Sequence, residues 1–304
     1  MSTVAIERSD QAIQGTGDLL NKLDFSKKAK NKTRVLIKPN LTTSAGPETG
    51  ITSDVRIVEA IIELLLDLGV ENISIGEGAG GAQTMHAFEK NGYVALGKKY
   101  DLPVLDLNFD ESVLLDVPEP LSMGKVRVSK TVYDSDFRIS VAKLKIHSIA
   151  VTTGTMKNMM GVLSGRRWKL IVHSDIHNRI VDLNKVVLPH FGVIDGVVGN
   201  QRDEVKSYPI EAGVLIAGFD PVAVDSIASE IMAVPWREVP HLVLAQQAGL
   251  GIADSAKIEI LGPRVEDVRQ QFDRRVTVWA KARTGAQIFS GRVWQTVEGA
   301  GKPL

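Results

Sequence analysis

The chain has 304 residues, with 36 basic and 36 acidic side chains and no cysteine. The balanced charge provides no long-range field, so we expect neither nucleic acid nor a membrane surface as a main partner. The absence of cysteine excludes disulfides, thiolate zinc sites and cysteine-ligated iron–sulfur clusters within this chain. No apolar run is long enough to span a bilayer, and the first residues lack a signal-peptide pattern, so we expect a cytoplasmic protein.

Strand and helix patterns alternate along the first part of the chain. Residues 34–38 predict a buried strand that Pro39 ends, and a polar loop follows. Ser53 is expected to cap a helix over residues 54–68, in which apolar residues recur at helical spacing. A second strand is predicted over residues 72–76. Strand, helix and strand joined by short connections predict two parallel strands with a right-handed crossover.

The same alternation continues with less regularity. Helices are predicted over residues 83–91, 155–160, 175–188 and 220–232. Strands are predicted over residues 103–107, 126–128, 137–142, 193–194, 213–217 and 257–261, with 126–128 at an exposed edge. The predicted fold class is therefore α/β, with a mostly parallel sheet flanked by helices.

The domain organisation follows from this pattern. Residues 1–262 are expected to form one α/β domain, either as a single body or as two lobes around a cleft. Residues 263–304 are more charged and irregular, and we expect a C-terminal helix or arm there. The glycine-flanked stretch 195–200 is expected to be a loop that serves as a lid or as one edge of a ligand site.

Ligands of open α/β sheets bind beyond the carboxyl ends of the parallel strands, so the residues after each strand are the first candidates. Lys38 ends the first strand, and Asn40 opens the loop after it, which makes both candidate ligand-binding residues. A lysine that only extends from the sheet edge is the structural alternative. Glu77 begins a glycine-rich turn after the second strand and is a candidate acid–base residue or ion-pair partner of Lys38. This turn lacks the spacing of a nucleotide fingerprint.

The densest polar cluster follows the strand predicted at residues 137–142. Lys143, Lys145 and His147 would share one face of an extended strand. We interpret Lys145 and His147 as candidate catalytic residues of an anion cradle, and a solvated edge strand is the alternative.

A short helix after this cluster extends the cradle. Thr152 or Thr153 is expected to cap it, and it carries Lys157 and Asn158 near its positive end. Thr153, Lys157 and Asn158 are therefore candidate ligand-binding residues.

The remaining candidates are a histidine and two aspartates. His173 and His177 stand four residues apart, as metal ligands on one helix face do, but a single catalytic His173 is the favoured reading. A metal-dependent enzyme that uses both together with His147 is the alternative. Asp195 and Asp225 are candidate ligand-binding residues because each follows or adjoins a strand end.

Several segments, in this order, resemble the domain-of-unknown-function family numbered 362. The resemblance covers about residues 33–262 and departs from the family pattern at residues 197–204. Many relatives carry a ferredoxin-like iron–sulfur module, so redox chemistry here would need a separate redox protein or a bound cofactor, whose identity stays open. The layout is also similar to that of lactate-racemase-type proteins. The matching pieces are residues 37–41, 76–78, 143–147, 157–161, 194–196, 220–225 and 249–251, with His173.

These observations predict an enzyme that binds a small anionic metabolite, either a carboxylate or a phosphorylated compound. Lys38, Lys145 and Lys157 would hold the anion, and His147 or His173 would move protons. The alternative is a non-catalytic ligand-binding module, or a partner subunit of a separate iron–sulfur electron-transfer protein.

Overall fold

The computed structural model of the protein describes residues 1–276 and 278–297. In this part of the chain, nine strands form one sheet in the order β11–β1–β10–β9–β7–β2–β3–β4, and β8 pairs with β7. A separate hairpin joins β5 to β6. The strands are β1 (Ser2–Arg8), β2 (Val35–Lys38), β3 (Ile73–Glu77), β4 (Val104–Asp106), β5 (Ser112–Asp116), β6 (Lys125–Ser129), β7 (Phe137–His147), β8 (Val151–Thr153), β9 (Phe191–Asn200), β10 (Pro209–Gly218) and β11 (Ile258–Leu261).

The helices alternate with these strands for most of the chain. They are α1 (Ala12–Lys22), α2 (Phe25–Ala29), α3 (Val55–Asp67), α4 (Thr84–Lys90), α5 (Tyr93–Tyr100), α6 (Lys130–Asp134), α7 (Thr155–Asn158), α8 (Arg166–His173), α9 (Ile176–Val187), α10 (Pro221–Ile231), α11 (Pro240–Gln247), α12 (Val265–Val268) and α13 (Val278–Val297). Within the described sheet, β8 and β10 run against the other strands. The mostly parallel sheet flanked by helices confirms the predicted fold class.

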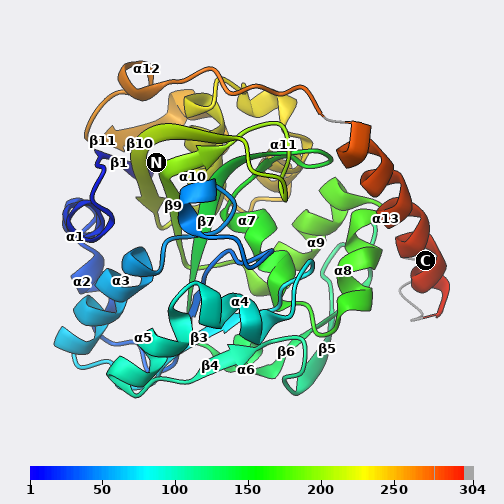
Figure 1. Ribbon diagram of the computed structural model, residues 1–304, viewed down its shortest axis with the longest axis horizontal. Helices are drawn as coiled ribbons and strands as arrows, with labels where there is room; N and C mark the ends of the chain where they lie inside the picture. The colour runs from blue at the N-terminus through cyan, green and yellow to red at the C-terminus, as the bar shows by residue number, and fades with distance from the viewer. Residues whose placement is uncertain (277, 298–304) are drawn as a thin grey trace.

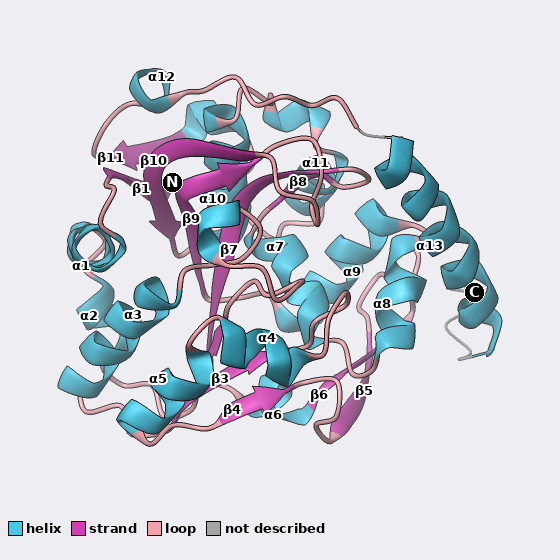
Figure 2. Cartoon of the chain, viewed as in Figure 1, coloured by secondary structure: helices cyan, strands magenta, loops and turns pink. Residues whose placement is uncertain are grey.

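The sheet has an apolar core on each face. In β2, Val35 and Ile37 point to one face, where they pack with residues of α1, α3 and α5, and Leu36 points to the other. The opposite face is covered by α7, α9, α10 and α11 (Figures 1 and 2). Each fully buried aliphatic side chain of this kind stabilises the fold by about 1.5–3 kcal/mol. The two layers hold the strands rigidly and leave the strand ends to carry the site.

The cap of helix α3 differs from the sequence prediction. Asp54, and not Ser53, caps the helix, because its carboxylate accepts the N–H of Arg56. The hydroxyl of Ser53 instead donates to the carbonyl of Val141, 2.8 Å away, and accepts the N–H of Asn40. Ser53 therefore fastens the loop after β2 to the neighbouring strand β7.

Two strands extend further than the sequence predicted. Strand β7 continues from Ala142 to His147, with its last five residues buried. The expected loop at residues 195–200 belongs to strand β9, which pairs with β10 through residues Gly192 to Asn200. The glycines of this segment led to the prediction of a loop. They are required instead by close packing within the strand, because a Cβ atom at Gly196 or Gly199 would lie within 3 Å of atoms in other parts of the protein.

Several elements were not predicted at all, including two strands and two helices. Strand β1, helices α1 and α8, and strand β5 lack strong apolar periodicity or lie in polar stretches. The expected edge strand at residues 126–128 is β6, which pairs with β5 in a two-stranded sheet, and its Val126 and Val128 are buried in the hydrophobic core. These elements depend on tertiary partners that the local pattern does not reveal.

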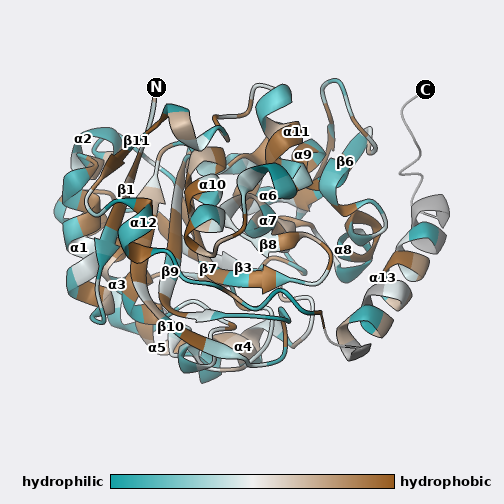
Figure 3. Cartoon of the chain, turned by 90° about the horizontal axis from the view of Figure 1, so that it is seen from above, coloured by the Kyte–Doolittle hydropathy of each residue, from teal (hydrophilic) through white to brown (hydrophobic). Residues whose placement is uncertain are grey.

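The C-terminal region ends in helix α13, which packs along α8 at the side of the molecule (Figures 1 and 3). The approach is close at Gly291, where a Cβ atom would lie 2.1 Å from the carbonyl oxygen of Leu170. None of the helices in the described part of the chain is both long and apolar enough to cross a membrane.

Candidate functional site

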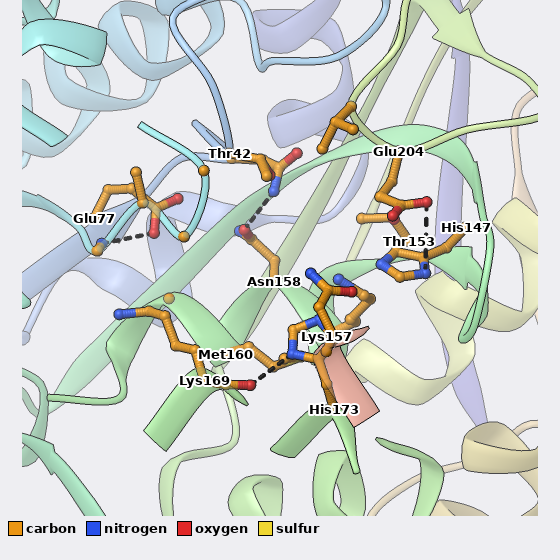
Figure 4. A pocket seen from close by; sticks show the side chains of 18 of the residues that line it. Thr42, Glu77, His147, Thr153, Lys157, Asn158, Met160, Lys169, His173 and Glu204 are labelled. Atoms are coloured by element: carbon orange, nitrogen blue, oxygen red, sulfur yellow. Dashed lines mark hydrogen bonds and ion pairs between the residues drawn. The ribbon is translucent and has the colours of Figure 1, made fainter. Parts of the chain in front are cut away.

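A cavity of about 300 Å³ lies at the carboxyl ends of β2, β3 and β7. Lys38, Glu77 and His147 are the last residues of these three strands. Helices α7 and α8 supply the facing wall, with Lys157 and His173 (Figure 4). This is the edge of the sheet at which open α/β folds bind ligands.

Nearly all of the residues singled out in the sequence line this one cavity. Asp195 and Asp225 do not. The parallel arrangement explains the convergence, because it brings strand ends that are far apart in sequence to one edge. The lining residues that were predicted are Lys38, Asn40, Glu77, Lys145, His147, Thr153, Lys157, Asn158 and His173.

Lys38 is fully engaged with the protein. Its ammonium is 2.9 Å from Oε2 of Glu77, 2.9 Å from Oδ1 of Asn158 and 3.0 Å from the carbonyl oxygen of Pro39. These three acceptors match the three N–H donors of a lysine. Burial lowers the pKa of Lys38, and the carboxylate of Glu77 opposes that shift. Lys38 and Glu77 thus form a buried pair that shapes the floor of the cavity.

The packing at this floor requires glycine. A Cβ atom at Gly161 would lie 2.0 Å from Oε1 of Glu77 and 2.7 Å from Nζ of Lys38. The glycine therefore lets the turn after α7 approach the ion pair directly. Asn40 joins the same network through its amide, which donates to Oδ1 of Asn158, but its own Oδ1 is buried without a hydrogen-bond partner.

Lys145 has a different environment from Lys38. It is equally buried, but it donates only to backbone carbonyl oxygens, at 2.8 Å to Ile51 and 3.4 Å to Glu204. Burial, followed by repulsion from Lys157, lowers the pKa of Lys145 to about 7. This lysine is therefore partly neutral at physiological pH.

Lys157 is the cation of the cavity that lacks a partner. Among the residues that the structure describes, no acceptor or carboxylate lies within bonding distance of its ammonium. Burial lowers the pKa of Lys157 to about 8, against the attraction of Glu204. The hydroxyl of Thr153, also on the cavity wall, is buried without a partner. Both groups have unused hydrogen-bonding capacity that faces the cavity.

The two histidines of the cavity differ in which ring nitrogen carries the hydrogen. Nδ1 of His147 accepts the N–H groups of Ile149 and Ala150, so the neutral ring carries its hydrogen on Nε2. Nδ1 of His173 lies 2.5 Å from the carbonyl oxygen of Lys169, and a carbonyl only accepts, so this nitrogen carries the hydrogen. Nε2 of His173 is then a free base.

Burial and the nearby charge of Lys157 keep both rings neutral. They lower the pKa of His147 well below its ordinary value and lower the pKa of His173 to about 4. His147 can therefore donate a hydrogen bond to a ligand, and His173 can accept one. The pair combines a donor and an acceptor in one cavity, which is the arrangement that proton transfer needs.

Five further lining residues with a charged or amide side chain were not singled out in the sequence. Glu204 lies in the loop after β9 and accepts the N–H of Ser148 at 3.0 Å. Its position after a strand was the available signal, but the strand was predicted to end too early. The other four residues lie on two helices that the sequence did not connect with a ligand site. Helix α8 contributes Arg166 and Lys169, and helix α13 contributes Arg283 and Gln287.

Helix α13 closes one side of the cavity. Arg283 donates to Oδ1 of Asp203 at 3.0 Å and to Oε1 of Glu204 at 2.5 Å. Gln287, one turn further along the helix, lines the cavity, and its Oε1 is buried without a partner. The C-terminal helix therefore contributes directly to a site built on strands near the other end of the chain.

The charge of the lining is strongly positive. Six basic side chains face two glutamates, Glu77 and Glu204. Lys38 pairs with Glu77 and Arg283 pairs with Glu204, so the other four basic groups have no carboxylate partner in the lining. These four are Lys145, Lys157, Arg166 and Lys169.

Asp195 holds the scaffold beneath the cavity. Its Oδ2 is 2.8 Å from Nζ of Lys143 in a fully buried ion pair, and it also accepts the N–H of Asp54. Lys143 and Lys145 thus take different roles although they stand two residues apart. A register shift between β7 and β9 lies between them.

Asp225 caps helix α7 from helix α10. It accepts the N–H groups of Thr155 and Met156 at 2.6 and 3.0 Å, and burial raises the pKa of Asp225 to about 6. This corrects the expectation that Thr152 or Thr153 caps the helix. The N-cap residue is Gly154, where a Cβ atom would lie 2.4 Å from the carboxyl carbon of Asp225.

His173 and His177 do not share a helix face, contrary to the expectation. His173 ends α8 and lines the cavity, while His177 lies in α9 and stacks on His241 with 5.5 Å between ring centroids. Among the described residues, no three histidine or carboxylate side chains converge as metal ligands would. The cavity therefore brings together His147 and His173 without His177.

Comparison with known proteins places these features in context. The model of the family described as domain of unknown function DUF362 matches residues 35–230, which is more than half of the chain. A thylakoid-associated protein from Synechocystis sp. is 25% identical over 224 residues, which cover 71% of this chain and 68% of that protein.

A solved structure with a similar fold is the lactate racemase apoprotein from Thermoanaerobacterium thermosaccharolyticum. It aligns with a TM-score of 0.52 and 14% identity. The match covers 79% of this chain, and this chain spans 58% of the length of that structure. At this identity the likeness shows the fold alone.

Proposed function

Since the chain belongs to the DUF362 family, whose description leaves the chemistry open, we propose from the site itself that the cavity binds a small anionic metabolite and transfers protons on it. The anion is a carboxylate or a phosphorylated compound. The fold and the cavity position agree with such an enzyme, and the residues below carry the argument.

The observation that carries the proposal is the ammonium of Lys157. It faces the cavity with no carboxylate or acceptor within bonding distance among the described residues, and desolvation lowers its pKa to about 8. An anionic ligand would stabilise this partly desolvated cation by supplying the missing charge-assisted hydrogen bond. The unpartnered hydroxyl of Thr153 supplies a donor on the same wall.

Proton transfer is supported by the two histidines. Nε2 of His173 is a free base, and Nε2 of His147 carries a hydrogen. A ligand held by Lys157 would have a proton acceptor and a hydrogen-bond donor within the same cavity. In this proposal His173 takes a proton from the ligand and His147 polarises an oxygen.

Ligand binding tests the proposal directly. Isothermal titration calorimetry with glycolate, oxalate and inorganic phosphate should detect at least one tight ligand. Lys157→Met should weaken its affinity by about 10- to 100-fold, as expected for the loss of a charge-assisted hydrogen bond of about 1.5–3 kcal/mol. Lys125→Met on strand β6, outside the cavity, is the matched control and should bind normally. Equal affinities in both variants would overturn the assignment of Lys157.

Turnover separates an enzyme from a binding module. With glycolate, the one of these three anions that has carbon-bound hydrogen, exchange of that hydrogen for solvent deuterium can be followed by NMR. His173→Gln should abolish the exchange while leaving affinity within about threefold, because the change removes the base and keeps a polar side chain. Binding without any exchange in the wild-type protein would instead favour the ligand-binding module.

A further inference from the structure

Three lysines are buried side by side at the carboxyl ends of β2 and β7. Lys38, Lys143 and Lys145 each expose 1% of their surface. Lys38 pairs with Glu77 at 2.9 Å, and Lys143 pairs with Asp195 at 2.8 Å. Lys145 differs from both, because its Nζ contacts only the backbone carbonyls of Ile51 and Glu204.

The surroundings of Lys145 favour the neutral amine. Lys143 and Lys157 repel a positive charge there, while Glu204 and Glu77 attract it. Burial outweighs all of these charges and brings the pKa of Lys145 to about 7, compared with about 10.4 for an exposed lysine. A substantial fraction of the molecules therefore carry an uncharged amine at neutral pH.

The geometry leaves the lone pair of this amine available. A neutral amine has two N–H donors, and the two carbonyl oxygens account for both. The third direction is the lone pair, and Lys145 belongs to the lining of the cavity. In the register of β7 and β8, Lys145 stands directly opposite Thr153, whose hydroxyl is buried without a partner. A donor for an oxygen atom thus lies beside the nucleophile.

We propose that Lys145 is an amine nucleophile that forms an imine with an aldehyde or ketone carrying an anionic group. The inference that the substrate is anionic rests on the proposed function of Lys157. The inference that Lys145 is a nucleophile rests on the surroundings of Lys145 itself. Desolvated lysines of this kind are the ones that form Schiff bases with carbonyl substrates.

The step balances without an oxidant or reductant. The lone pair of Nζ forms a bond to the carbonyl carbon, and the electron pair of the C=O π bond moves to the oxygen, which Thr153 can hydrogen-bond. Both hydrogens of the amine leave with that oxygen as water, and a C=N bond remains. If the imine takes up one proton, its single N–H can keep the shorter bond, to the carbonyl of Ile51.

Reductive trapping tests the proposal on the full-length protein. Glyoxylate is an anionic aldehyde, and formaldehyde is a small neutral one; cyanoborohydride supplies the hydride that converts either imine into a stable amine. Peptide mass spectrometry then locates the modified lysines. We expect Lys145 to be modified at neutral pH, with a rate that reaches half its maximum near pH 7. Lys38 and Lys143 are internal controls of equal burial and should stay unmodified.

The two reagents separate the nucleophile from the anion site. Lys157→Met should lower the ratio of the glyoxylate rate to the formaldehyde rate at Lys145 by about tenfold or more. The formaldehyde rate in the same variant accounts for the change in the pKa of Lys145 that follows the loss of the Lys157 charge. Reaction with formaldehyde but no preference for glyoxylate would support the nucleophile and overturn the anion site. If exposed lysines react with formaldehyde while Lys145 does not, the nucleophile is overturned even where anion binding is intact. This readout needs no Lys145 variant, so it does not depend on such a variant folding.

Discussion

Nζ of Lys38 lies 2.9 Å from Oε2 of Glu77, and this buried ion pair joins the carboxyl ends of two adjacent parallel strands. The carboxylate also accepts the N–H of Leu41 and of Gly78, so it holds the turns that follow both strands. The pair therefore sets the shape of the cavity floor on which the remaining lysines stand.

Removing one partner of this pair should destabilise the protein strongly. Glu77→Gln leaves the ammonium of Lys38 buried without a counterion, and such changes cost about 3–5 kcal/mol. Urea denaturation followed by circular dichroism measures the loss. Asp134→Asn, which breaks the exposed pair with Lys130, is the control and should cost about 0.3–0.5 kcal/mol. A Glu77→Gln protein as stable as that control would contradict a structural role for the pair.

Anion binding should take up protons and weaken at high pH. The pKa of Lys157 is about 8 in the empty cavity, and a bound anion raises it. The affinity for the anion should be highest well below pH 8, where Lys157 is charged. The affinity should fall as the pH rises through 8 and Lys157 loses its proton. Calorimetry of the tightest-binding anion in buffers of different ionisation enthalpy reports the proton uptake at pH 8. In Lys157→Met this uptake should fall sharply, and an unchanged value would assign it to other groups.

The cap of helix α7 should contribute measurably to stability. Asp225→Asn keeps the size of the side chain but replaces one acceptor oxygen by an amide, which faces the N–H of Met156 or of Thr155. An unsatisfied buried donor costs about 1–3 kcal/mol. Thermal denaturation should show this loss, whereas Asp267→Asn, at an exposed position, should leave the melting temperature nearly unchanged. Equal stabilities of the two variants would show that another group caps the helix.

Helix α13 should loosen when its anchor is removed. Arg283→Ala deletes the bonds to Asp203 and Glu204, so amides of residues 278–297 should exchange with deuterium faster. Hydrogen-exchange mass spectrometry measures this, with Arg275→Ala as the control because that exposed arginine pairs with the neighbouring Asp273 and does not line the cavity. Anion affinity should fall in the first variant alone. Unchanged exchange in Arg283→Ala would mean that packing on α8 holds the helix by itself.

Local sequence patterns predicted most strands of the sheet and nine of the residues that line the cavity. Apolar periodicity located α3, α9 and α10, and the structure shows Asp220 as the N-cap of α10. Strand ends followed by Lys38, Glu77 and His147 predicted one cluster, because parallel strands end at a common edge. Elements stabilised by distant partners, such as β1 between β10 and β11, had no local signal.

The sequence by itself indicated many of the polar groups that meet at the edge of the sheet, since parallel strands joined by short connections end at a common edge. Only the tertiary structure decided what each lysine does there. Lys38 and Lys143 find carboxylates 39 and 52 residues away, whereas Lys145 meets backbone carbonyls. The charge of a buried lysine depends on the partner within a few ångströms, and that partner is chosen by folding rather than by sequence spacing.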